Sequence, residues 1–140
     1  METVINAVLS EMQGLLDPHQ LKHLAITLRQ TLGPKQAEPG QDLLALFLTA
    51  KEVEGCSPKT IAYYETTLRH MNTALAKSYT QVESDDLRRY LNDYEMTRGS
   101  SKVTIDNIRR IMSSFFSWLE DEDYIVKSPV RRIRRVKTCL

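Results

Sequence analysis

The chain has 140 residues, and its 19 lysines and arginines against 18 aspartates and glutamates leave a formal net charge of +1. Hydrophobic residues make up 41% of the sequence and charged residues 26%, which is typical of a globular domain with at most a small addition and excludes a wholly disordered chain. No apolar run approaches the roughly 18 residues of a membrane span, and the N-terminus lacks a signal-peptide pattern, so we expect a cytoplasmic protein with no membrane partner.

Residues 1–33 have the pattern of two helices joined by a short turn. The first helix is predicted from about Thr3 to Leu16, with an apolar stripe of Val4, Val8, Met12 and Leu15 and with Ile5 and Leu9 beside it. Asp17 precedes Pro18 as the N-cap of the second helix, and Gln20 completes a capping box. A leucine stripe at positions 21, 24, 28 and 32 follows, and Gly33-Pro34 ends the helix. These residues predict a helical hairpin.

Residues 34–41 are predicted to be a linker, because two prolines lie there and no large apolar residue does. A domain of four helices is then expected over residues 42–138. Its first helix, from about Asp42 to Glu54, buries Leu43, Leu44, Phe47 and Leu48. Ser57-Pro58 opens a longer second helix whose stripe is Ile61, Tyr64, Leu68, Met71 and Leu75.

The third helix of this domain is predicted to begin at Ser84 as its N-cap and to end at Gly99. Its inward side chains are expected to be Leu87, Tyr90, Leu91 and Tyr94. The fourth begins at Ser100 or Ser101 and buries Ile105, Ile108, Met112, Phe115 and Leu119. No segment alternates with a period of two, so the sequence predicts an all-α fold, a hairpin followed by a four-helix bundle.

The sequence has no visible active site, metal site or cofactor motif. His19 and His23 share a helix face, but no third ligand stands near them, which favours structural histidines. No Gly-rich phosphate loop is present, and no base stands beside a nucleophile. The two cysteines, Cys56 and Cys139, are expected to be free thiols in a reducing compartment. We therefore expect no cofactor.

The near-zero net charge hides an uneven distribution. Residues 1–54 carry four basic and seven acidic residues, whereas residues 55–140 carry fifteen and eleven. The exit segment, residues 127–138, is strongly basic and has no acidic residue, which predicts contact with a polyanion. Its candidate contact residues are Arg131, Arg132, Arg134, Arg135 and Lys137. The alternative is a flexible solubilising tail.

Two helix starts combine hydroxyl residues with cations. The candidates are Ser57, Lys59, Thr60, Tyr63 and Arg69 in one helix, and Ser101, Lys102, Thr104, Asn107 and Arg110 in the other. Free backbone N–H groups at a helix start attract phosphate, and such side chains bind phosphates and base edges. The pattern alone nevertheless favours ordinary helix capping.

The motifs of the second part follow a known order. They are Leu46-Phe47-Leu48, Glu54 to Ile61 with Tyr64 and Leu68, Asp86 to Leu91, Ser101 with Thr104-Ile105, Phe115-Phe116 with Trp118-Leu119, and Tyr124 to Val130. In this order and spacing, residues 42–138 resemble the N-terminal core-binding (SAM-like) domain of tyrosine recombinases, the phage-integrase family.

The resemblance implies double-stranded DNA as the partner. In that family the domain clamps one face of the duplex, with two helices against the major groove, so the candidate residues of both helix starts become expected DNA contacts. The basic exit segment is then implied to cross the DNA backbone as an interdomain linker. The family's catalytic motifs belong to a following domain, so the chain is expected to be inactive alone and nucleoid-associated in a prokaryote.

Two other functions remain open. The short junction from Thr97 to Ser101 permits a helix-turn-helix transcription regulator. The hairpin of residues 1–33 is acidic and lies outside the family pattern, so it is expected to serve self-association or a protein partner. Simple packing that extends the core is the alternative for the hairpin.

Overall fold

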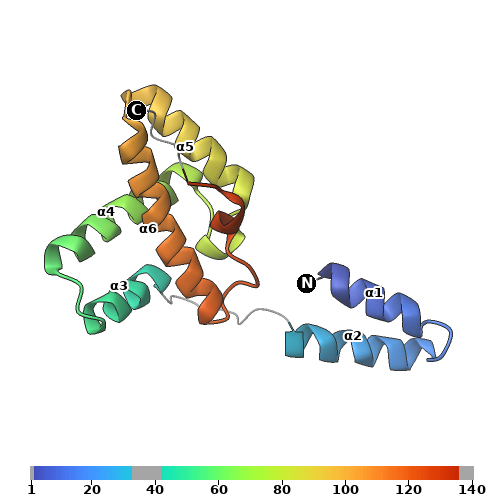
Figure 1. The fold of residues 1–140 in the computed structure, drawn as a ribbon. Coiled ribbons are helices and arrows are strands. Elements are labelled where there is room, and N and C mark those ends of the chain that lie inside the picture. Colours follow the sequence, from blue (N-terminus) through green and yellow to red (C-terminus); the bar gives the residue numbers. More distant parts are fainter. Residues whose placement is uncertain (1, 33–41, 136–140) are drawn as a thin grey trace. The chain divides into compact units, whose positions relative to one another are not determined.

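The structure is a computed structural model that describes residues 2–32 and 42–135. Within these ranges it is entirely helical (Figure 1). The elements are α1 (Glu2–Met12), α2 (Pro18–Leu32), α3 (Leu43–Val53), α4 (Pro58–Leu75), η1 (Tyr79–Gln81), α5 (Ser84–Arg98), α6 (Lys102–Asp121) and η2 (Pro129–Arg132). The predicted all-α fold is confirmed. The chain divides into two compact units, Met1–Lys35 and Gln36–Leu140. Some predictions fall outside the described residues: the linker at 34–41, the helix end at Gly33-Pro34, and the roles of Lys137 and Cys139.

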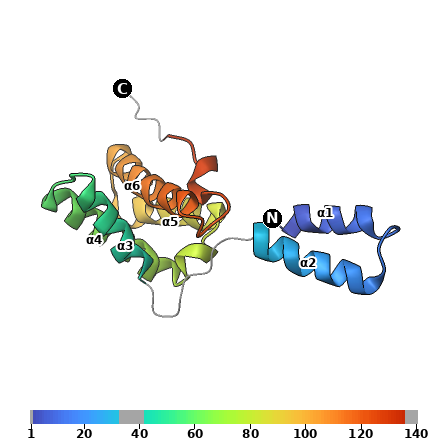
Figure 2. The ribbon, with the colours of Figure 1, turned by 90° about the horizontal axis from the view of Figure 1, so that it is seen from below.

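The first unit is a hairpin in which α1 and α2 lie side by side (Figure 2). The predicted capping box of α2 is present, because Asp17 Oδ1 accepts from the backbone N–H of Gln20 at 2.7 Å and Gln20 Oε1 accepts from that of Asp17 at 3.0 Å. The predicted stripe of α1 needs correction. Ile5 is 1% exposed whereas Val4 is exposed, and Leu15 lies beyond the helix end and is 77% exposed. Helix α1 stops at Met12, so Leu15 leaves the helical register.

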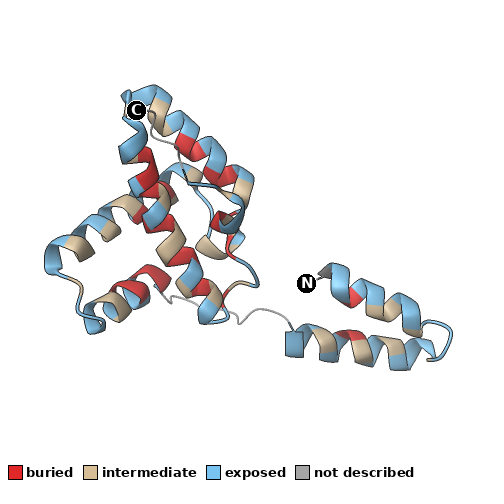
Figure 3. Cartoon of the chain, viewed as in Figure 1, coloured by how far each residue is buried: buried red, intermediate tan, exposed pale blue. Residues whose placement is uncertain are grey.

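The second unit is built around α6, which packs against α4, α5 and η2. The predicted apolar stripe of α6 is buried, and Ile111 and Phe116 of the same helix are buried as well. The Phe47 ring of α3 meets Phe115 of α6 edge-on with 5.1 Å between the ring centroids. Buried residues lie on the facing sides of α3, α4, α5 and α6, whereas the outer sides are exposed (Figure 3). This core fixes how the helix starts are placed.

The helix ends mostly follow the predicted caps. Ser57 and Ser101 each accept a hydrogen bond from a backbone N–H in the first turn of the helix that follows. Asp42, predicted from the sequence as the first residue of its helix, is instead the N-cap of α3 and accepts in the same way. Gly99 ends α5 in the left-handed region, at a φ of +60°, which glycine adopts at little cost. The N-cap of α5 is Glu83, one residue before the predicted Ser84. Asp86 Oδ2 accepts from the backbone N–H of Glu83 at 2.9 Å, while the Ser84 hydroxyl donates to Pro129 O at 2.6 Å and does not cap the helix.

The beginning of the exit segment is docked on the second unit. Val130 is 2% exposed, and Ser128 is also buried. The Glu120 carboxylate accepts from the backbone N–H of Ser128 at 2.7 Å and from Arg131 at 3.0 Å. Arg88 donates to Arg132 O at 3.3 Å. Residues 128–132 are therefore part of the folded domain, contrary to the alternative of a solubilising tail.

Candidate nucleic-acid interface

The two helix starts that carry the predicted contacts have the same capping geometry. Ser57 Oγ accepts from the backbone N–H of Thr60 at 3.2 Å and donates to Thr60 Oγ1 at 3.0 Å. Ser101 Oγ accepts from the backbone N–H of Thr104 at 3.2 Å, and the two hydroxyl oxygens are 3.1 Å apart. Both serine hydroxyls thus serve the caps in this structure. Thr60 and Thr104 are half-buried behind them.

Other predicted contacts point to solvent. Lys59 and Asn107 are exposed, and Tyr63 is half-exposed although it is a large aromatic residue. All three lie off the buried stripes of α4 and α6. Exposed amide and phenol groups on a helix can reach the edges of bases, while lysine reaches phosphates. These residues remain available to a ligand.

Half of the predicted cations that the structure describes are already paired with carboxylates. Arg69 lies 3.1 Å from Glu65, Lys102 lies 2.7 Å from Glu95, Arg110 lies 3.1 Å from Asp106, and Arg131 lies 3.0 Å from Glu120. Within residues 42–135, Lys59, Arg132, Arg134 and Arg135 have no carboxylate partner. The basic surface is therefore weaker than the sequence indicates, because several positive charges are neutralised at short range.

Residues from both candidate groups line one small cavity of about 160 Å³. Tyr63 of α4 and Thr104 of α6, which come from the two separate candidate groups, both line it. The remaining lining residues are Thr66, Thr67 and His70 of α4, Tyr90, Tyr94 and Arg98 of α5, and Ile108 of α6. No carboxylate lines this cavity. Its wall is mainly apolar, but hydroxyl, imidazole and guanidinium groups on it can donate hydrogen bonds to an anion.

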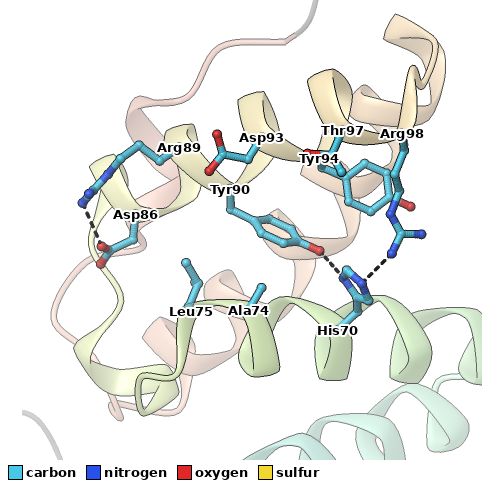
Figure 4. A pocket seen from close by; sticks show the side chains of 10 residues that line it. All are labelled: His70, Ala74, Leu75, Asp86, Arg89, Tyr90, Asp93, Tyr94, Thr97 and Arg98. Atoms are coloured by element: carbon cyan, nitrogen blue, oxygen red, sulfur yellow. Dashed lines mark hydrogen bonds and ion pairs between the residues drawn. The ribbon is translucent and has the colours of Figure 1, made fainter.

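The His70 and Arg98 side chains line this cavity and also a larger neighbouring one, where Figure 4 shows their contact. Arg98 Nη2 lies 2.7 Å from His70 Nε2, and His70 Nδ1 lies 2.7 Å from Tyr90 Oη. The Arg98 guanidinium also lies over the Tyr94 ring, 4.6 Å from its centroid. Burial raises the pKa of Tyr90 to about 12. The hydroxyl of Tyr90 is therefore neutral near physiological pH.

The sequence reasoning missed His70 and Arg98. The two residues are 28 positions apart, and their contact depends on how α4 crosses α5. Arg98 stands in the last turn of α5, where a cation near the helix C-terminus needs no further explanation. His70 and Arg98 both also line a second cavity of about 440 Å³, to which α5 contributes Asp86, Arg89 and Asp93 as well.

The described residues offer no sign of other chemistry. No group of three or more His, Cys, Asp or Glu side chains among them could hold a metal ion. Over the same ranges, no helix is long and apolar enough to cross a membrane. Cys56 is a half-buried free thiol.

Comparison with known families gives one match. The model of the phage integrase N-terminal SAM-like domain matches residues 43–125, which is more than half of the chain. The matched range runs from the start of α3 to just beyond α6 and includes the small cavity. No curated protein and no solved structure is significantly similar to the chain.

Proposed function

Because the chain belongs to the family of phage integrase N-terminal SAM-like domains, we propose that it binds duplex DNA as the core-binding domain of an integrase-type, site-specific tyrosine recombinase. Family membership agrees with the resemblance carried by the order of the sequence motifs. The proposed setting is the cytoplasm, at the nucleoid in a prokaryotic host.

The observation that carries the proposal is the carboxylate-free cavity between α4, α5 and α6. Tyr63 and Thr104 supply hydroxyl groups from two helices, and Arg98 supplies a guanidinium from a third. Guanidinium and hydroxyl groups are the side chains that most often bind DNA phosphates and base edges. Exposed Lys59 and Asn107 extend this surface along α4 and α6.

The paired cations would bind DNA by exchanging partners. When Lys102 or Arg110 contacts a phosphate, it loosens its present carboxylate contact, which lowers the net gain of binding. Arg132, Arg134 and Arg135 need no such exchange. We assign to these three arginines the contact between the exit segment and the DNA backbone.

The proposal assigns no strand cleavage to residues 1–140 alone. Tyrosine recombination needs a phenol that can attack a phosphate, and Tyr90 is a poor candidate. Tyr90 is a buried residue, and this burial raises its pKa to about 12. The catalytic groups of such a recombinase are expected in another domain.

The proposal is tested by fluorescence anisotropy with a labelled duplex of about 20 base pairs, over a salt series from about 50 to 200 mM. Affinity is expected to fall steeply with salt, by about 0.9 log units per log unit of salt for each phosphate contact. Tyr63→Ala combined with Asn107→Ala should weaken binding, whereas Lys22→Ala in the hairpin should not. No binding at about 50 mM salt, or a flat salt dependence, would rule the proposal out.

A second candidate is a helix-turn-helix regulator, which the short connection between α5 and α6 favours. Only residues 99–101 separate these two helices, and helix-turn-helix motifs use turns of this size. Footprinting distinguishes the two functions. A regulator would protect two half-sites about one helical turn apart as a dimer, whereas a core-binding domain need not.

For the hairpin we propose self-association with a second copy. Among residues 2–32, Ile5 and Ala25 are the buried apolar residues, while Val4, Ile26 and Leu32 are exposed. Two helices with so small a core gain stability by packing in a larger bundle. Deletion of residues 1–33 should lower the oligomeric state measured by light scattering. An unchanged oligomeric state contradicts self-association.

A further inference from the structure

The hydrogen bonds around His70 define its protonation state. A guanidinium can only donate, so His70 Nε2 must accept from Arg98 at 2.7 Å. The ring is then neutral, with its proton on Nδ1, and this N–H donates to Tyr90 Oη at 2.7 Å. One neutral tautomer satisfies both partners, and an imidazolium does not.

Arg98 differs from the other cations of the interface. Its recorded partners are the neutral His70 ring and the face of the Tyr94 ring, and it makes no ion pair within the described residues. Lys102 and Arg110, by contrast, each have a carboxylate at short range. The charge of Arg98 is therefore not neutralised, and the residue is exposed at the edge of the cavity that Tyr63 and Thr104 line.

Proton uptake at His70 changes this arrangement. Once protonated, Nε2 becomes a donor and can no longer accept from Arg98, so two cations face each other without a hydrogen bond. An anion placed between them would accept from both Nε2–H and the guanidinium. A DNA backbone phosphate has the charge and the several oxygens that this geometry requires.

We propose that His70 and Arg98 form a backbone-phosphate site of the DNA interface, which is completed when His70 takes up a proton. The inference rests on the proposed DNA-binding function and names a contact and a regulation within it. By linkage, the phosphate and the proton each strengthen the binding of the other. DNA affinity should therefore be higher at acidic pH than at alkaline pH.

The other groups around His70 affect the size of this pH-dependent increment in DNA affinity but not its sign. From α5 it is faced by Tyr90, Tyr94 and Arg98, and α6 contributes only the uncharged Thr104 and Ile108 to the shared cavity. Besides His70, Tyr63 is the titratable residue of α4 that lines this small cavity. The larger cavity is lined by His70 and Arg98 together with Asp86, Arg89 and Asp93. Asp93 makes no hydrogen bond or ion pair with His70 or Arg98 within the described residues, but its carboxylate lowers the gain from a phosphate bound there. Asp86 is held by Lys77 and Arg89, so it does not serve as the partner of a protonated His70.

The test measures duplex affinity by anisotropy across salt series at about pH 8 and about pH 5.5, a range that spans histidine titration. For the wild-type chain, one additional phosphate contact should steepen the salt slope by about 0.9 and tighten binding about fivefold to tenfold near 0.1 M salt at the lower pH. His70→Gln should lose this increment, because glutamine does not take up a proton. His19→Gln and His23→Gln, in the hairpin, should keep it.

Arg98→Gln provides a second variant that alters an exposed side chain and leaves the core intact. It should also lose the steeper slope at low pH, and circular dichroism at both pH values checks that each variant is folded. If His70→Gln and Arg98→Gln keep the full wild-type increment, the phosphate site is overturned while DNA binding stands. If the wild-type chain binds no duplex at either pH, the proposed function itself fails.

Discussion

Lys102 Nζ lies 2.7 Å from Glu95 Oε1, so the cation at the start of α6 is held by a carboxylate of α5. The second oxygen of Glu95, Oε2, is buried and has no hydrogen-bond partner. Lys102 therefore does two things at once, because it offers a positive charge to a ligand and it compensates a carboxylate beside the proposed DNA surface. This pair gives the first prediction.

Replacing Lys102 by alanine should weaken DNA binding by more than the loss of one cation, because the Glu95 carboxylate would then repel phosphate. The double variant Lys102→Ala with Glu95→Gln should recover part of the affinity. Anisotropy titrations of the wild type, both single variants and the double variant complete a double-mutant cycle. Purely additive effects on the free energy of binding would contradict the coupling.

The aromatic core predicts a large loss of stability from one substitution. Phe115 is fully buried, and its ring meets those of Phe47 and Tyr79 edge-on at 5.1 and 4.8 Å between centroids. Phe115→Ala should lower the free energy of unfolding by about 3–5 kcal/mol, because it removes the ring and leaves a cavity. Urea denaturation measures this, with exposed Val126→Ala as a control expected to change stability by less than about 0.5 kcal/mol. A small effect of Phe115→Ala would contradict the packing.

The docking of residues 128–132 on the second unit should depend on Glu120. Its two oxygens accept from the backbone N–H of Ser128 and from Arg131, so it joins α6 to η2. Glu120→Ala should raise amide hydrogen exchange in residues 128–132 and lower the free energy of unfolding by about 1–3 kcal/mol. Exposed Glu122→Ala provides the matched control on the same acidic turn. Equal exchange in both variants would show that Glu120 does not hold the segment.

Acid stability should depend on Asp86. The ammonium of Lys77 at 2.8 Å, followed by the backbone N–H of Glu83, holds the pKa of Asp86 below its ordinary value of 3.8. A depressed pKa stabilises the folded state above the unfolded-state value, and this contribution is lost as the pH falls through the folded-state pKa. Asp86→Asn should therefore lower stability at pH 7 but have a shrinking effect below about pH 4.

Urea denaturation at several pH values measures that difference between the wild type and Asp86→Asn. Asp85→Asn, on the exposed side of the same turn, should cause only a small change in stability at any pH, because the ion pair of Asp85 with Arg88 is solvated. A constant difference between the wild type and Asp86→Asn down to pH 2 would exclude the ionised carboxylate as its source.

Much of the fold was predictable because its signals are local. Ser57, Ser101 and Gly99 mark helix ends through bonds and dihedral angles within a few residues. The stripes of α4 and α6 follow from a period of 3.6 residues. The stripe of α1 was placed wrongly, since the apolar residues there cover a broad arc and only the packing against α2 selects Ile5 over Val4.

The sequence by itself determined the helices of the second unit, their order and the family to which the chain belongs. Only the tertiary structure decided which charges are compensated. Ser84 reaches Pro129 across 45 positions, and Arg98 reaches His70 across 28. Helical periodicity shows which face of a helix is buried, but the partner of an exposed side chain depends on where two helices cross. The small cavity, its lack of carboxylates and the His70–Arg98 contact all arise at that crossing.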